Sequence, residues 1–253
     1  MQNISQYFQK AGLNIYVTDK PIGHFAPRSA QSKDIFQMTI DAGHPEQFRI
    51  FKGQGNDVRV LDYDKKKEQV LLFVKEPKRT FTSLSYDPLL KKNVEIKQET
   101  PDHIRRYLMG MDERHYFISE LPDKQGKINS IDDAHRVLKP SEVKDRVKHK
   151  KDPIQRQGEW FFVAATPAEL LLIDEKLAFS AKLSPLQYDV AIGTRGKPHT
   201  AQYLLRIDKN IFIKGTVRHV DHAKKTFSTW QRVFRNTENI AVQSRNAVLG
   251  WID

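Results

Sequence analysis

The stretch from Ile213 to Glu238 reads IKGTVRHVDHAKKTFSTWQRVFRNTE and sets histidines, an aspartate and arginines into a pattern that otherwise alternates like a β-hairpin. Residues two apart in a strand point to the same face. The alternation therefore predicts His219 and Asp221 on one face, with Arg218 and His222 on the other. Imidazole and carboxylate groups on rigid strands can bind a metal ion or transfer protons, so this hairpin is the first candidate site.

Strand-like runs also occupy the first hundred residues. The clearest lies between Asp57 and Glu76, where two apolar runs flank the charged turn YDKKK and predict a hairpin. A short helix is expected from Ile4 to Gly12. The remaining strand-like runs are Leu13 to Val17, Ile35 to Ile40, Phe48 to Lys52, Thr80 to Tyr86 and Val94 to Lys97. Together they predict an N-terminal β-meander over residues 1–100.

Helical patterns are concentrated between residues 103 and 148. They are the helix-like segment His103 to Met109, the capped and amphipathic segment Ser130 to Leu138, and Ser141 to Lys148 after Pro140. The β pattern returns after residue 155. We therefore expect an α+β protein with a mainly antiparallel β-sheet or a barrel-like scaffold and a helical insertion near 103–148. Residues 101–253 are expected to form a second domain, unless both halves share one core.

The composition narrows the class of protein. The chain has 253 residues, no cysteine, and 42 Lys and Arg against 31 Asp and Glu, which gives a net charge of +11. Without cysteine there is no disulfide, thiolate ligand or cysteine nucleophile. No run approaches the roughly 18 apolar residues of a membrane span, and no signal-peptide pattern begins the chain, so a cytoplasmic protein without membrane contact is expected. The positive charge favours a polyanionic partner, first of all nucleic acid, as RNA or DNA.

Three further segments, DERHYF, RQGEWFF and GTRGKPH, combine charged groups with glycine or aromatic neighbours. The carboxylate in RQGEWFF is costly to bury unless it is paired, so an arginine or a metal ion is expected beside it. GTRGKPH offers flexible backbone, two cations and an imidazole to a phosphate, although it lacks P-loop spacing. The candidate residues of these segments are Arg114, His115, Arg156, Glu159, Lys197 and His199.

The blocks DERHYF, RQGEWFF, GKPH and GTVRHVDH together resemble a family of uncharacterised bacterial hypothetical proteins, over roughly Arg105 to Glu238. The resemblance implies that these blocks belong together, and it implies no activity. HVDH is also similar to the metal motif HxHxDH of the metallo-β-lactamase fold, but Val217 at the first histidine position argues against that family. An HNH-type nuclease is not supported either, because Asp221 and His222 lack the ββα context and the final histidine.

Three functions fit these residues. The favoured one is a basic nucleic-acid-associated protein that binds the phosphate backbone at an Arg- and His-rich site on β-strands, because arginine beside each candidate ligand would repel a metal ion. The first alternative is a nucleic-acid hydrolase, either dependent on zinc, manganese or iron, or a metal-free RNase that uses two imidazoles. The second alternative is an accessory or protein-interaction module inside a complex.

The hydrolase alternative assigns catalysis to His219, His222, Asp221, Glu159 and His115. Among these, the expected metal ligands are His219, Asp221 and His222. Phosphate binding is assigned to Arg114, Arg156, Lys197, His199, Arg218 and Arg232.

Overall fold

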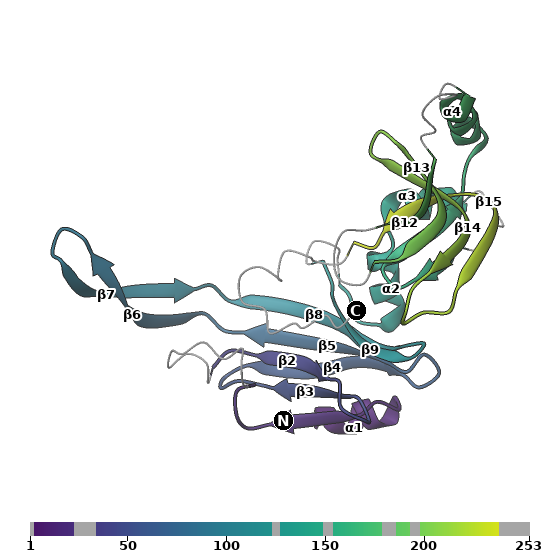
Figure 1. Ribbon diagram of the computed structural model, residues 1–253. Coiled ribbons are helices and arrows are strands. Elements are labelled where there is room, and N and C mark those ends of the chain that lie inside the picture. Colours follow the sequence, from purple (N-terminus) through teal and green to yellow (C-terminus); the bar gives the residue numbers. More distant parts are fainter. Residues whose placement is uncertain are drawn as a thin grey trace. The chain divides into compact units, whose positions relative to one another are not determined.

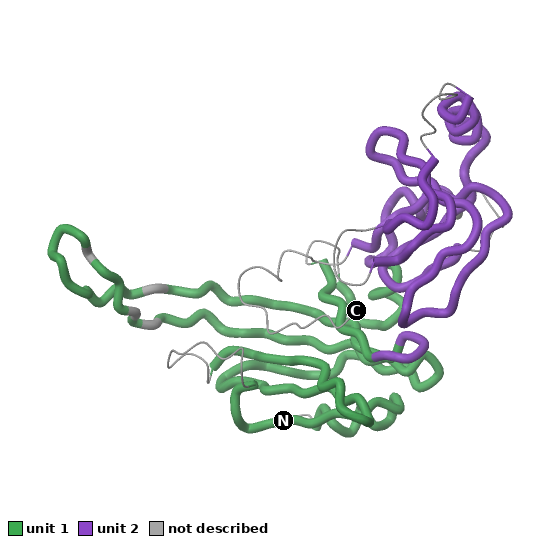
Figure 2. The backbone as a smooth tube through the Cα atoms, in the orientation of Figure 1, with its two compact units in different colours: residues 1–111, 116–136, 238–252 green, residues 112–115, 137–237, 253 purple. Residues whose placement is uncertain are grey.

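The computed structural model describes residues 3–22, 34–122, 127–148, 154–178, 186–192 and 198–237. Contacts between residues divide the chain into two compact units (Figure 2). The first unit comprises residues 1–111, 116–136 and 238–252, and the second comprises residues 112–115, 137–237 and 253. Strands dominate both units, and nearly all of the strand pairs are antiparallel, so the expected α+β class is confirmed.

The first unit begins with helix α1 (Ile4–Lys10) and a three-stranded sheet in the order β1-β3-β2 (Figure 1). The strands are β1 (Ile15–Thr18), β2 (Gln37–Asp41) and β3 (Gln47–Phe51), with β1 parallel to β3 and β2 antiparallel to it. The ring of Phe8 in α1 meets the ring of Phe48 edge-on, with 5.5 Å between their centroids. Because both side chains are fully buried, packing holds this short helix rather than its own propensity.

A four-stranded sheet follows, in the order β4-β5-β8-β9. Its strands are β4 (Asp57–Asp64), β5 (Gln69–Glu76), β8 (His103–Asp112) and β9 (His115–Glu120). The hairpin expected between Asp57 and Glu76 is confirmed by the antiparallel pairing of β4 with β5. Strand β5 is buried along almost its whole length, as a central strand should be.

The helix expected from His103 to Met109 is wrong, because this segment is strand β8. It pairs with β5, and Tyr107 lies opposite Leu72 while Leu108 lies opposite Leu71. The backbone groups on the second edge of the buried strand β5 need hydrogen-bond partners, and β8 provides them. This tertiary requirement outweighs a short helical pattern, and it extends the sheet past residue 100.

Between β5 and β8 the chain forms a separate two-stranded antiparallel sheet, which we call the β6–β7 ribbon. It consists of β6 (Arg79–Asp87) and β7 (Lys92–Thr100), and it extends away from β5 and β8 (Figure 1). The pairing is regular from Arg79 opposite Thr100 to Asp87 opposite Lys92. The two strands predicted in this part of the sequence are thereby confirmed.

Helices α2 (Ile131–Leu138) and α3 (Ser141–Lys148) confirm the two later helices predicted in the insertion. The Ser130 hydroxyl accepts the backbone N–H of Asp133 at 3.1 Å, and the Asp133 carboxylate accepts the N–H of Ser130 at 3.2 Å. These reciprocal bonds cap the start of α2. The helical part of the insertion is thus limited to residues 131–148.

The second unit contains a six-stranded antiparallel sheet in the order β10-β11-β15-β14-β13-β12. Its strands are β10 (Gln155–Gln157), β11 (Trp160–Ala164), β12 (Gln187–Ala191), β13 (Thr200–Ile207), β14 (Asn210–Arg218) and β15 (Lys225–Arg235). Within the described ranges the sheet ends at β10 and β12, so the barrel-like alternative is not borne out. The sequence from Ser180 to Gly196 predicts mostly loop, but it contains strand β12.

Helices cover one face of this sheet. Ile173 of α4 (Pro167–Ala178) packs with Phe212, and Val143 of α3 packs with Phe161. The other face carries its own apolar cluster, which includes Trp160, Phe162, Ile213, Val217 and Phe227. Trp160 is therefore a core residue and not an exposed stacking platform. No helix in the described part of the chain is long and apolar enough to cross a membrane.

Candidate metal centre

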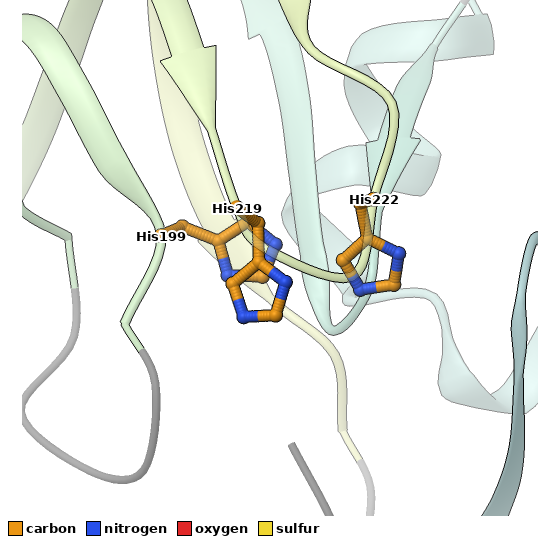
Figure 3. A group of neighbouring side chains, drawn as sticks. All are labelled: His199, His219 and His222. Atoms are coloured by element: carbon orange, nitrogen blue, oxygen red, sulfur yellow. The ribbon is translucent and has the colours of Figure 1, made fainter.

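Three histidines come together in the second unit (Figure 3). His199 lies directly before β13, His219 directly after β14, and His222 in the loop from β14 to β15. One nitrogen from each ring lies within 4.8 Å of the others. Nitrogen ligands at such distances need only small side-chain adjustments to reach the roughly 2.0–2.1 Å bonds of a zinc site. The three rings therefore form a candidate metal centre.

Strand register explains why the first two rings meet. Thr200 is paired with Arg218 across β13 and β14, so His199 before β13 lies beside His219 after β14. Their ring centroids are 4.2 Å apart, and the ring of His222 lies 4.8 Å from that of His219.

The alternation expected through His219 and His222 is wrong. Strand β14 ends at Arg218, and the chain is irregular from residue 219 to residue 224, so faces no longer alternate residue by residue. This loop brings His222 back toward His219 instead of placing it on the opposite face.

The most buried of the three rings is that of His199, with 2% of the residue exposed. Burial, together with the neighbouring His219 and His222, lowers the pKa of His199 to about 3. The neutral imidazole is the form that binds a metal ion. Among the described residues, His199 Nε2 and His222 Nδ1 are buried without any hydrogen-bond partner. An unsatisfied buried nitrogen is costly, and a bound cation would remove that cost.

His219 is held differently. Its Nδ1 accepts the backbone N–H of Asp221 at 3.2 Å, which places the proton of the neutral ring on Nε2. Binding a metal ion through either nitrogen requires this long hydrogen bond to open, at a cost of about 1 kcal/mol. That cost is small beside the free energy of binding a transition metal.

A glycine lies against the rings. Gly158, in the turn between β10 and β11, has φ +54°, and a Cβ there would lie 3.0 Å from His222 Nε2 and 3.2 Å from His199 Cε1. Both the backbone conformation and the lack of a side chain are needed for this approach. The sequence singles out the block RQGEWFF, but for its glutamate rather than for this glycine.

Asp221 lies beside the histidine cluster and is not part of it. Its Oδ1 is 3.6 Å from His115 Nε2, and its backbone N–H supports His219. Of the three ligands expected from the sequence, His219 and His222 are brought together, and His199 joins them where Asp221 was expected. His199 had been assigned to phosphate binding.

The loop that carries His219 and His222 is fastened at Ala223. The Glu113 carboxylate accepts the N–H of Ala223, and the Gln157 side chain donates to its carbonyl oxygen at 2.5 Å. Gln157 lies next to Gly158, so the same turn that contacts the rings also holds the loop. Neither Glu113 nor Gln157 is among the residues selected from the sequence.

Alternation through RQGEWFF predicts Glu159 and Phe161 on one face of a strand, but Glu159 lies in the β10–β11 turn and not in a strand, so this prediction is wrong. The carbonyl oxygen of Glu159 accepts the N–H of Asn236 at 2.8 Å. Arg156 donates from Nε to the carbonyl oxygen of Gly158 at 2.7 Å. Both residues stabilise the turn beneath the histidines.

The other basic candidates are not aimed at the cluster. Arg232 binds Glu169, with 2.8 Å between Nη1 and Oε1, and Arg218 contacts Asp189 at 3.2 Å. Arg114 is exposed in the turn before β9. Lys197 lies outside the described residues. Because Arg218 and Arg232 already face carboxylates, the expected repulsion between arginine and a metal ion is weaker than the sequence suggests.

Models of known protein families, curated proteins and solved structures were compared with the chain, and none of them matches. The resemblance to a bacterial family therefore stays a prediction. What the structure defines is a donor set of three imidazoles, and three protein ligands with one open coordination position are typical of catalytic zinc sites.

Proposed function

We propose that the protein is a nucleic-acid-associated hydrolase in which His199, His219 and His222 hold one divalent transition metal ion, with zinc or manganese as the candidates. The observation that carries the proposal is the convergence of three imidazoles, two of which have buried nitrogens without partners among the described residues. The buried ring of His199 is poorly suited to bind phosphate directly, because its lowered pKa leaves it uncharged near neutral pH.

The number of ligands favours catalysis over a structural role. A structural zinc ion is normally enclosed by four protein ligands, whereas three leave one position for water or substrate. His219 and His222 are only partly buried, and Val220 between them is 67% exposed, so solvent reaches this side of the cluster. A metal ion in such a site lowers the pKa of a bound water and promotes hydrolysis.

The charge distribution supports an anionic substrate. Residues 137–237 contain 19 Lys and Arg against 10 Asp and Glu, a surplus of nine. The rest of the chain contains 23 against 21, so nearly the whole net charge of +11 comes from the segment with the histidines. A surplus of this size attracts phosphate backbones through counterion release, which makes a phosphodiester in RNA or DNA the favoured substrate.

A second candidate function is a basic nucleic-acid-binding module that acts without metal. It is supported by the same charge surplus and by the Asp221–His219 hydrogen bond, which would not need to open. A metal-free RNase has less support, because the low pKa of His199 prevents that ring from serving as a general acid near neutral pH. In each case a cytoplasmic protein, alone or in a complex, is proposed.

The test uses the full chain and three variants, His199→Ala, His219→Ala and His222→Ala. Zinc and manganese binding are measured by calorimetry, and cleavage of labelled RNA and DNA is measured with EDTA and after metal is restored. We expect binding and metal-dependent cleavage in the native protein and loss of both in each variant. His103→Ala, an exposed histidine at the start of β8, is the matched control and should change neither.

Native protein that binds neither metal would contradict the metal proposal. Salt-sensitive nucleic-acid binding that persists in all three variants would then favour the basic binding module. Cleavage of RNA alone that resists EDTA would favour the metal-free RNase.

A further inference from the structure

The β6–β7 ribbon has no core of its own. None of its side chains that the structure describes is buried. Large apolar groups are exposed along it and at its tip: Leu84 at 69%, Tyr86 at 61%, Leu89 at 92%, Leu90 at 57% and Ile96 at 39%. An isolated two-stranded ribbon is marginally stable in water, and three or more strands are needed for independent stability.

The ribbon also presents free strand edges. Among the described strands, β6 pairs only with β7, so the outer edge of β7 exposes backbone N–H and C=O groups along nine residues. Such an edge is a template for another strand. The identity of that strand can be inferred from the sequence of β7, which reads KNVEIKQET.

We propose that β7 pairs antiparallel with β7 of a second copy of this chain, with Ile96 of one copy opposite Ile96 of the other. The result is a four-stranded sheet in the order β6-β7-β7-β6. In this register Glu95 of each copy lies opposite Lys97 of the other, so the contact gains two cross-strand ion pairs and one apolar pair. Cross-strand pairs of opposite charge and of β-branched residues stabilise a sheet.

Charge and the apolar pair together favour this register. Centring the contact on Gln98 would also place Lys97 opposite Glu99, but Glu99 already contacts Lys78 at 2.6 Å and Ile96 would then lie opposite Thr100. Centring the contact on Lys97 would place Lys97 opposite itself and Glu95 opposite Glu99, and centring it on Glu95 would place two glutamates together. Like charges directly opposite one another are destabilising. Glu95 and Lys97 are both exposed, and neither has an ion-pair partner in the described part of the chain, so both are available for the second copy. On β6 the residues flanking Leu84 are serines, which specify no register.

The test measures the mass of the full chain in solution by analytical ultracentrifugation over a range of concentrations. The native protein should be in equilibrium with a dimer. Lys97→Glu should place glutamates opposite each other in both pairs, and Glu95→Lys should place lysines there. Each single variant should weaken the dimer roughly tenfold or more, while circular dichroism shows an unchanged fold.

Two further samples, a double variant and a mixture of the two single variants, then serve as matched controls. The double variant Glu95→Lys with Lys97→Glu exchanges the charges and should recover the dimer. Mixing the two single variants should give a heterodimer, because each carries the charges that the other lacks. A native protein that stays monomeric at every concentration, or a dimer that neither single variant weakens, would overturn the proposal.

Two other occupants of the ribbon would be recognised in the same experiments. A monomer whose nucleic-acid binding is lost in Leu89→Ala would identify the ribbon tip as a wedge for nucleic acid and overturn the dimer. If the protein is a monomer and Leu89→Ala does not change its nucleic-acid binding, the ribbon would be assigned to binding a different protein. This result would also overturn the dimer. The proposal does not depend on the histidine cluster, so the metal experiments neither support nor contradict it.

Discussion

The β14–β15 hairpin and the β6–β7 ribbon are similar in strand length, but they differ in their neighbouring strands and in how many side chains they bury. Each strand has nine residues except β15, which has eleven. Strands β14 and β15 lie inside a six-stranded sheet and bury Phe212 and Ile213 on its two faces, whereas the ribbon buries none of its described side chains. The comparison shows that strand pairing alone does not make a site: the hairpin that holds His219 and His222 at its loop is the one supported by a sheet on both sides.

The ionic contacts of the two hairpins differ in the same way. Arg232 of β15 shares the Glu169 carboxylate of α4 with Arg146 of α3, and all three side chains are less than 20% exposed. The ribbon is joined by an ion pair of 2.6 Å between Lys78 and Glu99, with side chains 61% and 56% exposed. The contacts of Glu169 connect helices α3 and α4 to strand β15, whereas the Lys78–Glu99 pair is exposed to solvent.

The largest effect is expected at Glu169. Glu169→Gln leaves two nearly buried arginines without a carboxylate, which should lower the free energy of unfolding by about 3 kcal/mol. Denaturant unfolding followed by circular dichroism measures this loss. Glu175→Gln, an exposed glutamate on the same helix, is the control and should change stability by less than about 0.5 kcal/mol. Equal effects of the two changes would remove the contrast between the hairpins.

The contribution of Glu169 depends on pH in a defined direction. Burial opposes ionisation of its carboxyl, but hydrogen bonds from Arg146 and from the Thr166 backbone lower its pKa to about 2, below the ordinary 4.5. A group with a depressed pKa stabilises the fold above its unfolded pKa and loses that effect as pH falls toward the folded pKa. The difference in Tm between native protein and Glu169→Gln should therefore be constant near neutral pH and should shrink between about pH 4.5 and pH 2.

An intermediate effect is expected at Gly158. Comparing its substitution with that of Gly55 distinguishes the cost of backbone strain from the cost of contact with the histidines. Gly158→Ala adds a Cβ at 3.0 Å from His222 Nε2, while Gly55→Ala adds one in open space at φ +73°. Both changes should cost about 1–2 kcal/mol for the left-handed conformation. Only Gly158→Ala should also weaken zinc binding, by about tenfold, because it displaces the rings. Calorimetric titration of both variants checks this, and equal zinc affinities would show that the turn does not position the ligands.

The smallest effect is expected at the ribbon's ion pair. Glu99→Gln should lower stability by less than about 1 kcal/mol, because exposed pairs gain little and are screened by salt. Unfolding in low and high salt measures the effect, which should disappear in high salt. A loss as large as that at Glu169 would mean that the Lys78–Glu99 pair is covered in solution, and the contrast between the hairpins would be weaker than the structure indicates.

The sequence predicts elements whose signals are local. The hairpin from Asp57 to Glu76 and the capped helix after Ser130 are confirmed, because turn residues and caps lie within a few positions of what they define. The helix predicted for His103 to Met109 is wrong, because strand β5, which needs a second partner strand, lies much earlier in the sequence. The pairing of His199 with His219 depends on strand register, which a single hairpin's pattern does not contain.

The start of helix α4 is also marked by a local signal in the sequence. Thr166, Pro167, Ala168 and Glu169 form a capping box: the Thr166 hydroxyl accepts the Glu169 N–H at 3.3 Å and the Glu169 carboxylate accepts the Thr166 N–H at 2.8 Å. This pattern marks the start of α4, whereas the apolar run from Thr166 to Leu172 alone is compatible with either a helix or a strand. That the same carboxylate also binds Arg146 and Arg232 could not be predicted, because the three residues are far apart in the sequence.

The β8–β9 turn has a consequence for how such a site can be inherited. Residues 112–115 belong by their contacts to the second unit, although the strands on either side belong mostly to the first. Glu113 fastens Ala223, which lies 110 residues later in the chain. Recombination that transferred residues 137–237 to another gene would carry the sheet and all three histidines, yet it would leave this fastening behind. Neither unit corresponds to one continuous piece of coding sequence, so an exchange of either as a single segment would break contacts within it.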